Sequence, residues 1–258
     1  MNNKFWQKSA ALVIVIVLAG SAYAYVHIHN KRMIIYNLSQ GIQQDIAKVN
    51  PVAQTPADKN LPQKVLLQVP FTSQAPFAEW SDEEYDSACE EANVLMAYYW
   101  ATGHSEEKIP AQEAKNKIAD EIAFEQKNYG FSYDSSAADT VKWASAYFNF
   151  NNFKLETDIS IDEIKNQLAA GNVVLAFMDG QKLGNPNYTA PGPTTHVLLI
   201  KGYDLASGQF ITNDSGTRNG ENFEYKFATI DNALRDYPTG HREPITAIHK
   251  DIIVVSKK

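Results

Sequence analysis

Residues 86–103 read DSACEEANVLMAYYWATG and hold Cys89, the one cysteine of the 258-residue chain. From Ala88 onward, apolar side chains recur at spacings of three and four, the period of an amphipathic helix with one buried face. The members of this pattern are Ala92, Leu95, Met96, Tyr99 and Trp100. Gly103 is typical of the residue at which a helix ends. The stretch therefore predicts a helix that begins close to Cys89.

The predicted position of Cys89 favours chemistry at its sulfur. Asp86 or Ser87 is a suitable N-cap, which places Cys89 in the first helical turn. Free backbone N–H groups and the positive end of the helix dipole favour a thiolate there. A lone cysteine is equally a small buried apolar residue. The helix alone leaves both interpretations open, and the rest of the chain has to decide between them.

Composition limits the classes of function. The chain is 44% hydrophobic and 11% aromatic, which indicates an ordered core. A single cysteine makes no internal disulfide, so any folded domain is stabilised by that core alone. The net charge is −7, and residues 1–32 carry four cations and no acid, which leaves −11 on the remainder. So acidic a body argues against a nucleic-acid partner.

Residues 1–32 predict a membrane anchor or signal segment. Met1–Lys8 is polar and cationic, and Ser9–Val26 is an uncharged run of 18 residues, just long enough to span a bilayer. Ala22-Tyr23-Ala24 fits a signal-peptide cleavage site, whereas the flanking tyrosines and Lys31-Arg32 favour an uncleaved anchor. In either case we expect the rest of the chain outside the cytoplasm, as a single-pass membrane protein or a secreted one.

Residues 33–63 contain three prolines in KVNPVAQTPADKNLPQ and few large apolar residues, which predicts a stalk. A folded domain is expected over residues 64–258. Its first half predicts helices over Ala111–Lys127, Ala137–Phe148 and Ser160–Ala170. Its second half predicts strands over Asn172–Met178, His196–Tyr203, Gln209–Asn213 and Ile245–Val255. Helices followed by strands indicate an α+β fold.

A cysteine nucleophile needs a base, and His196 is the best placed of the six histidines. It begins an apolar strand directly after residues 179–195, DGQKLGNPNYTAPGPTT, a long Gly- and Pro-rich segment of the kind that forms binding loops. By itself His196 fits a catalytic base and a core histidine equally well. His27 and His29 are spaced for a metal only if a strand faced them together, and a polar edge beside the membrane explains them better.

A base in turn needs an orienting group, and residues 213–216, Asn-Asp-Ser-Gly, end the next predicted strand. Asp214 supplies a carboxylate that suits the second imidazole N–H, although Asp before Ser-Gly is also common in turns. Asn213 is a rival, because adjacent strand residues point to opposite faces of a sheet.

Four blocks of sequence now support one resemblance: VPFTSQAPFAEW, ACEEAN, THVLLIKGYD and ITNDSGTRNG, in that order. Together they resemble the C39-like branch of the papain-like cysteine peptidases, in its bacterial form without transporter domains. The resemblance implies an α+β fold in which the cysteine helix packs on an antiparallel sheet. It implies a triad of Cys89, His196 and Asp214, and it assigns Gln74 to the oxyanion hole.

The residues after the cysteine depart from the better-known members of that family, which have Gly-Pro where this chain has Glu90 and Glu91. A carboxylate beside a thiolate raises the pKa of the thiol and opposes the helix dipole. The same two acids would also suit a cationic group of a substrate. Gln74 lies fifteen residues before Cys89, so the loop containing Trp80 has to fold back to bring the amide to the sulfur.

The sequence therefore predicts a membrane-tethered or secreted thiol hydrolase that cleaves peptide bonds or peptidoglycan stem amides, with no metal and no organic cofactor. Acyl transfer to an amine would use the same residues. The alternative is a catalytically silent domain of the same fold that binds peptide or cell-wall material beneath residues 179–195. The two differ in whether Cys89 is an activated thiol.

Overall fold

The computed structural model describes residues 61–240 and 244–258. The predicted segment 1–32 and nearly all of the predicted stalk at 33–63 lie outside the described residues, so both stay predictions. Among the helices that are described, none combines the length and the apolar character needed to cross a membrane.

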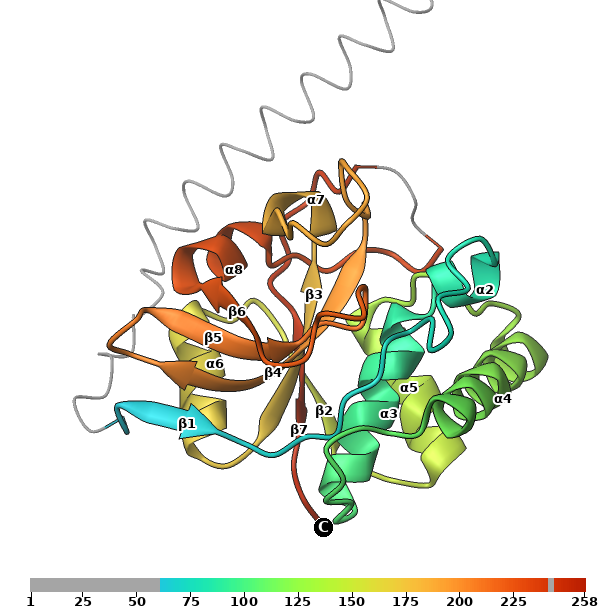
Figure 1. Cartoon of the computed structure of the whole chain (residues 1–258), viewed down its shortest axis with the longest axis horizontal. Coiled ribbons are helices and arrows are strands. Elements are labelled where there is room, and N and C mark those ends of the chain that lie inside the picture. The colour runs from blue at the N-terminus through green and yellow to red at the C-terminus, as the bar shows by residue number, and fades with distance from the viewer. Residues whose placement is uncertain (1–60, 241–243) are drawn as a thin grey trace, which may run out of the picture. The chain divides into compact units, whose positions relative to one another are not determined.

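An antiparallel sheet forms the centre of the domain (Figure 1). Its strand order is β2-β7-β3-β4-β5-β6. The bounds are β2 Phe153–Glu156, β7 Ile252–Val255, β3 Val173–Met178, β4 His196–Asp204, β5 Gln209–Asn213 and β6 Phe223–Lys226. Strand β1, Lys64–Leu66, pairs with the last three residues of β4, whereas β3 pairs with its first five. Strand β4 therefore lies at the middle of the sheet, with His196 at its first position.

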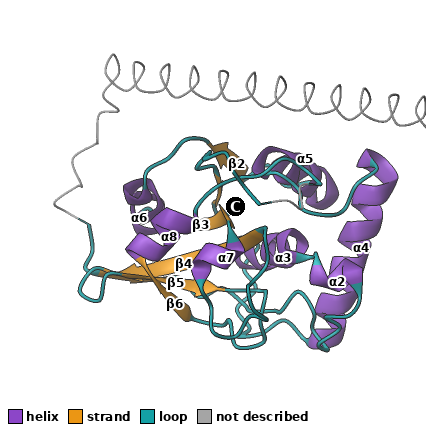
Figure 2. Ribbon diagram, turned by 90° about the horizontal axis from the view of Figure 1, so that it is seen from above, coloured by secondary structure: helices purple, strands orange, loops and turns teal. Residues whose placement is uncertain are grey.

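Both faces of the sheet are covered, as the alternation along β3 shows. Val173, Leu175 and Phe177 join the core on one face, where α3, Cys89–Ala101, α4, Ala111–Tyr129, and α5, Ala137–Phe148, pack. Val174, Ala176 and Met178 join a second core with α6, Ile161–Ala169, and α8, Phe227–Ala233. Figures 1 and 2 show the two groups of helices on opposite sides of the strands. This arrangement confirms the α+β prediction.

Helix α3 is the most deeply buried of the described helices. Twelve of its thirteen side chains are buried, and Tyr98 is the exception. The prediction of one buried face is wrong, because α3 lies between β4 on one side and α4 and α5 on the other and so has no solvent face. Complete burial of a helix requires polar side chains within it to find partners inside the protein.

Several element boundaries differ from the predictions. Asp86 ends a short helix, α2 (Glu83–Asp86), instead of capping α3, whose N-cap is Ala88. The predicted strand at Ile245–Val255 forms only from Ile252, so the strand prediction for its first seven residues is wrong. A one-turn helix, α7 (Gly180–Leu183), interrupts the predicted loop at 179–195. The sequence did not predict strands β2 and β6 or helix α8, because apolar patterns this short cannot be distinguished from loops.

Candidate active site

Cys89 is the first residue of α3. The N-cap, Ala88, makes no side-chain capping bond, so the first N–H groups of the helix are not taken by a cap. Cys89 lines a cleft of about 830 Å³, which also has Gln74 and His196 in its wall. The loop after α7 and the turn after β5 complete that wall. The helix N-terminus therefore opens onto the same cavity as the predicted base.

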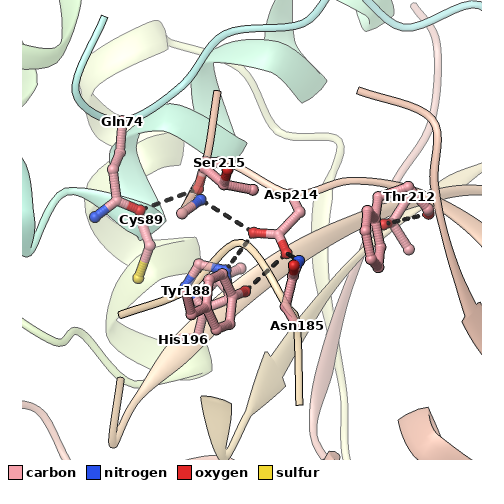
Figure 3. Close-up of polar contacts among 12 residues, drawn as sticks. Gln74, Cys89, Asn185, Tyr188, His196, Thr212, Asp214 and Ser215 are labelled. Carbon is pink, nitrogen blue, oxygen red and sulfur yellow. Dashed lines mark hydrogen bonds and ion pairs between the residues drawn. The ribbon is translucent and has the colours of Figure 1, made fainter. Parts of the chain in front are cut away.

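His196 and Asp214 form a buried pair beside Cys89. The His196 Nε2 atom lies 2.9 Å from Asp214 Oδ1, and the two side chains are 2% and 0% exposed (Figure 3). Asp214 directly follows β5, and β4 and β5 are neighbouring strands, so the sheet register fixes the separation of the pair. With Nε2 bound to Asp214, Nδ1 is the ring nitrogen left to exchange a proton with the thiol.

Asp214 is held as a carboxylate by five hydrogen-bond donors. Oδ1 accepts from His196 and from the Gly216 N–H at 3.0 Å. Oδ2 accepts from the hydroxyls of Tyr225 at 2.6 Å and Tyr188 at 2.7 Å, and from the Asn185 amide at 2.8 Å. Burial alone would raise the pKa of Asp214, but His196 and the two hydroxyls outweigh it and hold the pKa below its ordinary value.

Asn213, the alternative third residue, points elsewhere. Its Nδ2 atom donates to the carbonyls of Val69 and Pro70 at 3.3 and 3.4 Å. The two adjacent side chains therefore serve different purposes. Asn213 ties β5 to the segment before Gln74, and Asp214 contacts His196.

Gln74 lies in the cleft wall, but its amide is already bonded. Its Nε2 atom donates to the carbonyls of Tyr85 at 3.1 Å and Asp86 at 2.7 Å. Its Oε1 atom accepts from the Ser215 hydroxyl at 3.3 Å. The loop containing Trp80 does fold back, as the sequence required, and Gln74 links the end of α2 to the turn that carries Asp214.

Glu90 and Glu91 are 2% and 1% exposed, and neither lines the cleft. The expectation that they bind a cationic substrate group is wrong, because α4 and the sheet enclose this part of α3. Cys89 Sγ donates to Glu90 Oε2 at 3.1 Å. Burial and the neighbouring Glu90 raise the pKa of the Cys89 thiol well above its ordinary value, as the acid beside the cysteine predicted.

The two other histidines in the described part of the chain, His104 and His249, do not line the cleft. The His104 ring stacks on Tyr99, with 4.2 Å between ring centroids, and its Nδ1 atom lies 3.0 Å from Glu106. His249 precedes β7 and is largely exposed, instead of lying within a strand. His27, His29 and His241 fall outside the described residues. Within residues 61–240 and 244–258, no three His, Cys, Asp or Glu side chains are arranged to hold a metal ion.

Sequence reasoning missed Asn93, which joins three parts of the site. Its fully buried Nδ2 atom donates to Cys89 O at 2.7 Å, to Val197 O at 3.0 Å and to Ser215 Oγ at 3.0 Å. One signal pointed to it, since Asn93 lies one helical turn after Cys89 and is polar within an apolar pattern. Tyr188, Tyr225 and Asn185 gave no such signal, because loop and edge-strand residues have no register until the chain has folded.

A cysteine at a helix start and a histidine paired with an aspartate on an adjoining antiparallel sheet border one cleft, an arrangement that suits a cysteine peptidase. The comparison with family models agrees, since residues 66–239 match the Peptidase_C39 like family. The chain belongs to that family.

Solved structures that are similar to this chain include two bacterial proteins. A C39-like peptidase from Bacillus anthracis is 17% identical, with a TM-score of 0.41, over 76% of this chain and 100% of that one. Xylellain, a cysteine protease from Xylella fastidiosa, is 16% identical, with a TM-score of 0.33, over 80% of this chain and 90% of that one. None of the curated proteins matches.

Proposed function

We propose that this protein hydrolyses peptide bonds with Cys89 as nucleophile, His196 as general acid and base, and Asp214 as the group that orients His196. The observation that carries the proposal is the buried 2.9 Å contact between His196 Nε2 and Asp214 Oδ1, on the cleft that Cys89 also lines. A carboxylate fixed by five donors keeps the proton on Nε2 and leaves Nδ1 as the acceptor.

The reaction follows from that arrangement. The Cys89 thiol gives its proton to His196 Nδ1, and the sulfur attacks the substrate carbonyl carbon. His196 then delivers the proton to the leaving amine as the C–N bond breaks, and a thioester to Cys89 remains. Water attacks the thioester with His196 as base, and the thiol and the carboxylic acid product are released.

In this proposal the backbone N–H of Cys89 and the amide of Gln74 stabilise the oxyanion. The first of these donors is available at the start of α3. For the second, the Gln74 amide must transfer one N–H from the carbonyl of Tyr85 or Asp86 to the substrate oxygen. Substrate entry would thereby loosen the link between Gln74 and the end of α2.

The substrate we propose is a peptide or the stem-peptide amide of peptidoglycan. The cleft wall supports a peptide backbone as ligand, because it presents many hydroxyl and amide groups: Gln74, Ser87, Asn187, Thr189, Thr194, Thr195, Thr217 and Asn219. We propose further that residues 1–32 place the domain outside the cytoplasm, at the membrane or after secretion. The support is the 18-residue uncharged run at Ser9–Val26.

The test is the rate of Cys89 alkylation by iodoacetamide as a function of pH, measured on the full chain in mild detergent. A free thiol titrates near ~8.5. A charged Glu90 opposes the thiolate, so the test applies where Glu90 is protonated. There we expect fast alkylation well below that pH in the parent and its loss in His196→Ala, with His249→Ala as the matched control because His249 is exposed. Slow alkylation with an ordinary or raised pKa in both parent and His196→Ala would refute the enzymatic proposal.

A further inference from the structure

Glu90 is the hydrogen-bond partner of the nucleophile in this structure. Its Oε2 atom lies 3.1 Å from Cys89 Sγ, and its Oε1 atom accepts the Tyr237 hydroxyl at 2.8 Å. Cys89, Glu90 and Tyr237 are 4%, 2% and 2% exposed, so water contributes little to this chain of contacts. Both carboxyl oxygens are used, and one of them is used by the reacting sulfur.

The surroundings of Glu90 are acidic. The titratable groups that face Cys89 and Glu90 are Glu91 on α3, Glu125 on α4, Asp134 before α5, His196 on β4 and Tyr237 after α8. Within the described part of the chain, the hydrogen-bond partners of Glu90 are Cys89 and Tyr237, neither of which is a cation. A charge on Glu90 is therefore felt strongly at the sulfur 3.1 Å away.

The same contact has opposite consequences in the two protonation states of Glu90. As a carboxylate, Glu90 accepts a hydrogen bond from the Cys89 S–H group, and its negative charge opposes formation of a thiolate. As a neutral carboxyl, it donates its own O–H to the sulfur and stabilises a thiolate. A separation of 3.1 Å between Sγ and Oε2 suits a hydrogen bond in either direction, so a change of protonation at Glu90 is enough to change the reactivity of Cys89.

We propose that Glu90 is a further catalytic residue, which holds the Cys89 thiolate as a neutral O–H donor and holds Cys89 as an inert thiol when it is ionised. The proposal rests on the proposed peptidase function. The S–H proton still passes to His196, and the Glu90 proton is neither gained nor lost during turnover. Glu90 sets how much of the enzyme carries the thiolate–imidazolium pair.

This role predicts that the alkylation rate of Cys89 falls as the pH rises above the pKa of Glu90. Burial and the neighbouring acids raise the pKa of Glu90 well above its ordinary value, while the bonds to Cys89 and Tyr237 oppose the rise. The neutral carboxyl therefore persists above the usual carboxyl range. As pH rises through that elevated pKa, Glu90 ionises and the thiolate–imidazolium pair reverts to a neutral thiol and imidazole.

Glu90→Gln tests the proposal. Glutamine keeps the shape of the neutral acid, since its N–H donates to the sulfur and its oxygen accepts from Tyr237. Glu91→Gln is the matched control, because it removes the same charge from the next residue of the same buried helix without touching the sulfur. The measurement is the alkylation rate of Cys89 in the full chain from about pH 5 to 10, with melting curves on each variant.

In the parent and in Glu91→Gln we expect fast alkylation in weak acid and a fall of about tenfold as Glu90 ionises, since one unit of pKa is a factor of ten. In Glu90→Gln we expect no fall. A fall of equal size in Glu90→Gln, or its absence from the parent, would overturn the proposal. Loss of the fall in Glu91→Gln would also overturn it, because the acidic cluster as a whole would then be responsible.

Two comparisons between these variants separate failure of the Glu90 proposal from failure of the peptidase proposal. If the parent alkylates no faster in weak acid than His196→Ala, the peptidase proposal itself fails. If those two differ and Glu90→Gln behaves as the parent, the Glu90 proposal alone fails. Tyr237→Phe is the second variant, because removing a donor from the Glu90 carboxylate should move the fall to higher pH.

Discussion

Replacing Asp214 by asparagine tests how the His196 tautomer is set. The substitution keeps the size of the side chain but turns one acceptor oxygen into an NH2 group. In the parent, Oδ1 accepts from His196 and the Gly216 N–H, while Oδ2 accepts from three donors, two of them tyrosine hydroxyls. An amide has one oxygen, so one of these two groups of donors must face an N–H.

These contacts indicate which of the two orientations of the asparagine amide has the lower free energy. If the amide oxygen took the His196 side, the Asn185 N–H would face the NH2 group and lose its acceptor, at about 1–3 kcal/mol, and both tyrosine hydroxyls would have to turn from donating to accepting. We therefore expect the oxygen on the side of the tyrosines and the NH2 toward His196. His196 then accepts at Nε2 and carries its proton on Nδ1, facing the cleft, where it cannot act as a base.

The expected loss of turnover is about 10⁴-fold, the scale known for a triad histidine held in the wrong tautomer. That corresponds to about 5.5 kcal/mol of lost transition-state stabilisation. The cost to folding should be far smaller, about 1–3 kcal/mol, since only the Gly216 N–H loses its acceptor. The loss of transition-state stabilisation should therefore exceed the loss of folding stability by several kcal/mol.

The assay combines Cys89 alkylation at pH 6 with cleavage of a peptide mixture, followed by mass spectrometry, and thermal melting of each variant. Asp204→Asn is the matched control, because Asp204 makes the same type of contact at the surface, with Lys64 at 3.1 Å. If Asp214→Asn alkylates and turns over like the parent, Asp214 does not set the tautomer. If activity falls only in proportion to melting, Asp214 is a packing residue.

Two other predictions concern the same domain. In Gly216→Ala the new Cβ would lie 2.9 Å from His196 Cε1, so the imidazole ring has to shift. We expect turnover to fall about 100-fold with little change in the melting temperature. Unchanged turnover would show that the ring tolerates the methyl group. Burial raises the pKa of the Glu125 carboxyl from 4.5 to about 8. Between these two values the folded protein holds a proton that the unfolded chain releases. The contribution of this proton to folding stability is therefore complete below pH 4.5 and is lost as the pH rises to about 8. Glu125→Gln should melt progressively higher than the parent as pH rises through this range, and a difference independent of pH would contradict the assigned cause.

The Cys89 thiol of this domain is hydrogen-bonded to the carboxyl group of Glu90 and is surrounded by further acidic residues. Glu90 occupies the first turn of α3, where the helix dipole favours a negative charge, yet the sulfur beside it needs the opposite. A protonated Glu90 is uncharged, so the thiolate of Cys89 supplies the negative charge that the helix dipole favours. This is the physical reason to expect a pH limit on catalysis that His196 alone would not impose.

The sequence by itself determined the helix that begins at Cys89, the strand that begins at His196 and the α+β order of elements, because hydrophobic periodicity and Gly and Pro signals act locally. The resemblance carried by four short blocks pointed to Cys89, His196, Asp214 and Gln74. In the fold, Cys89, His196 and Gln74 line one cleft, and Asp214 lies buried behind it in contact with His196. Local patterns were enough for these features because each depends on neighbours within one element.

Only the tertiary structure revealed that Asp214, and not Asn213, contacts His196, because the contact depends on the direction in which each side chain leaves the end of β5. It also revealed that Glu90 contacts the sulfur instead of a substrate, since burial of α3 by α4 and the sheet is a property of packing and not of the helix sequence. The partners of a buried polar group come from distant parts of the chain, as Tyr237 does for Glu90, and no local pattern encodes them.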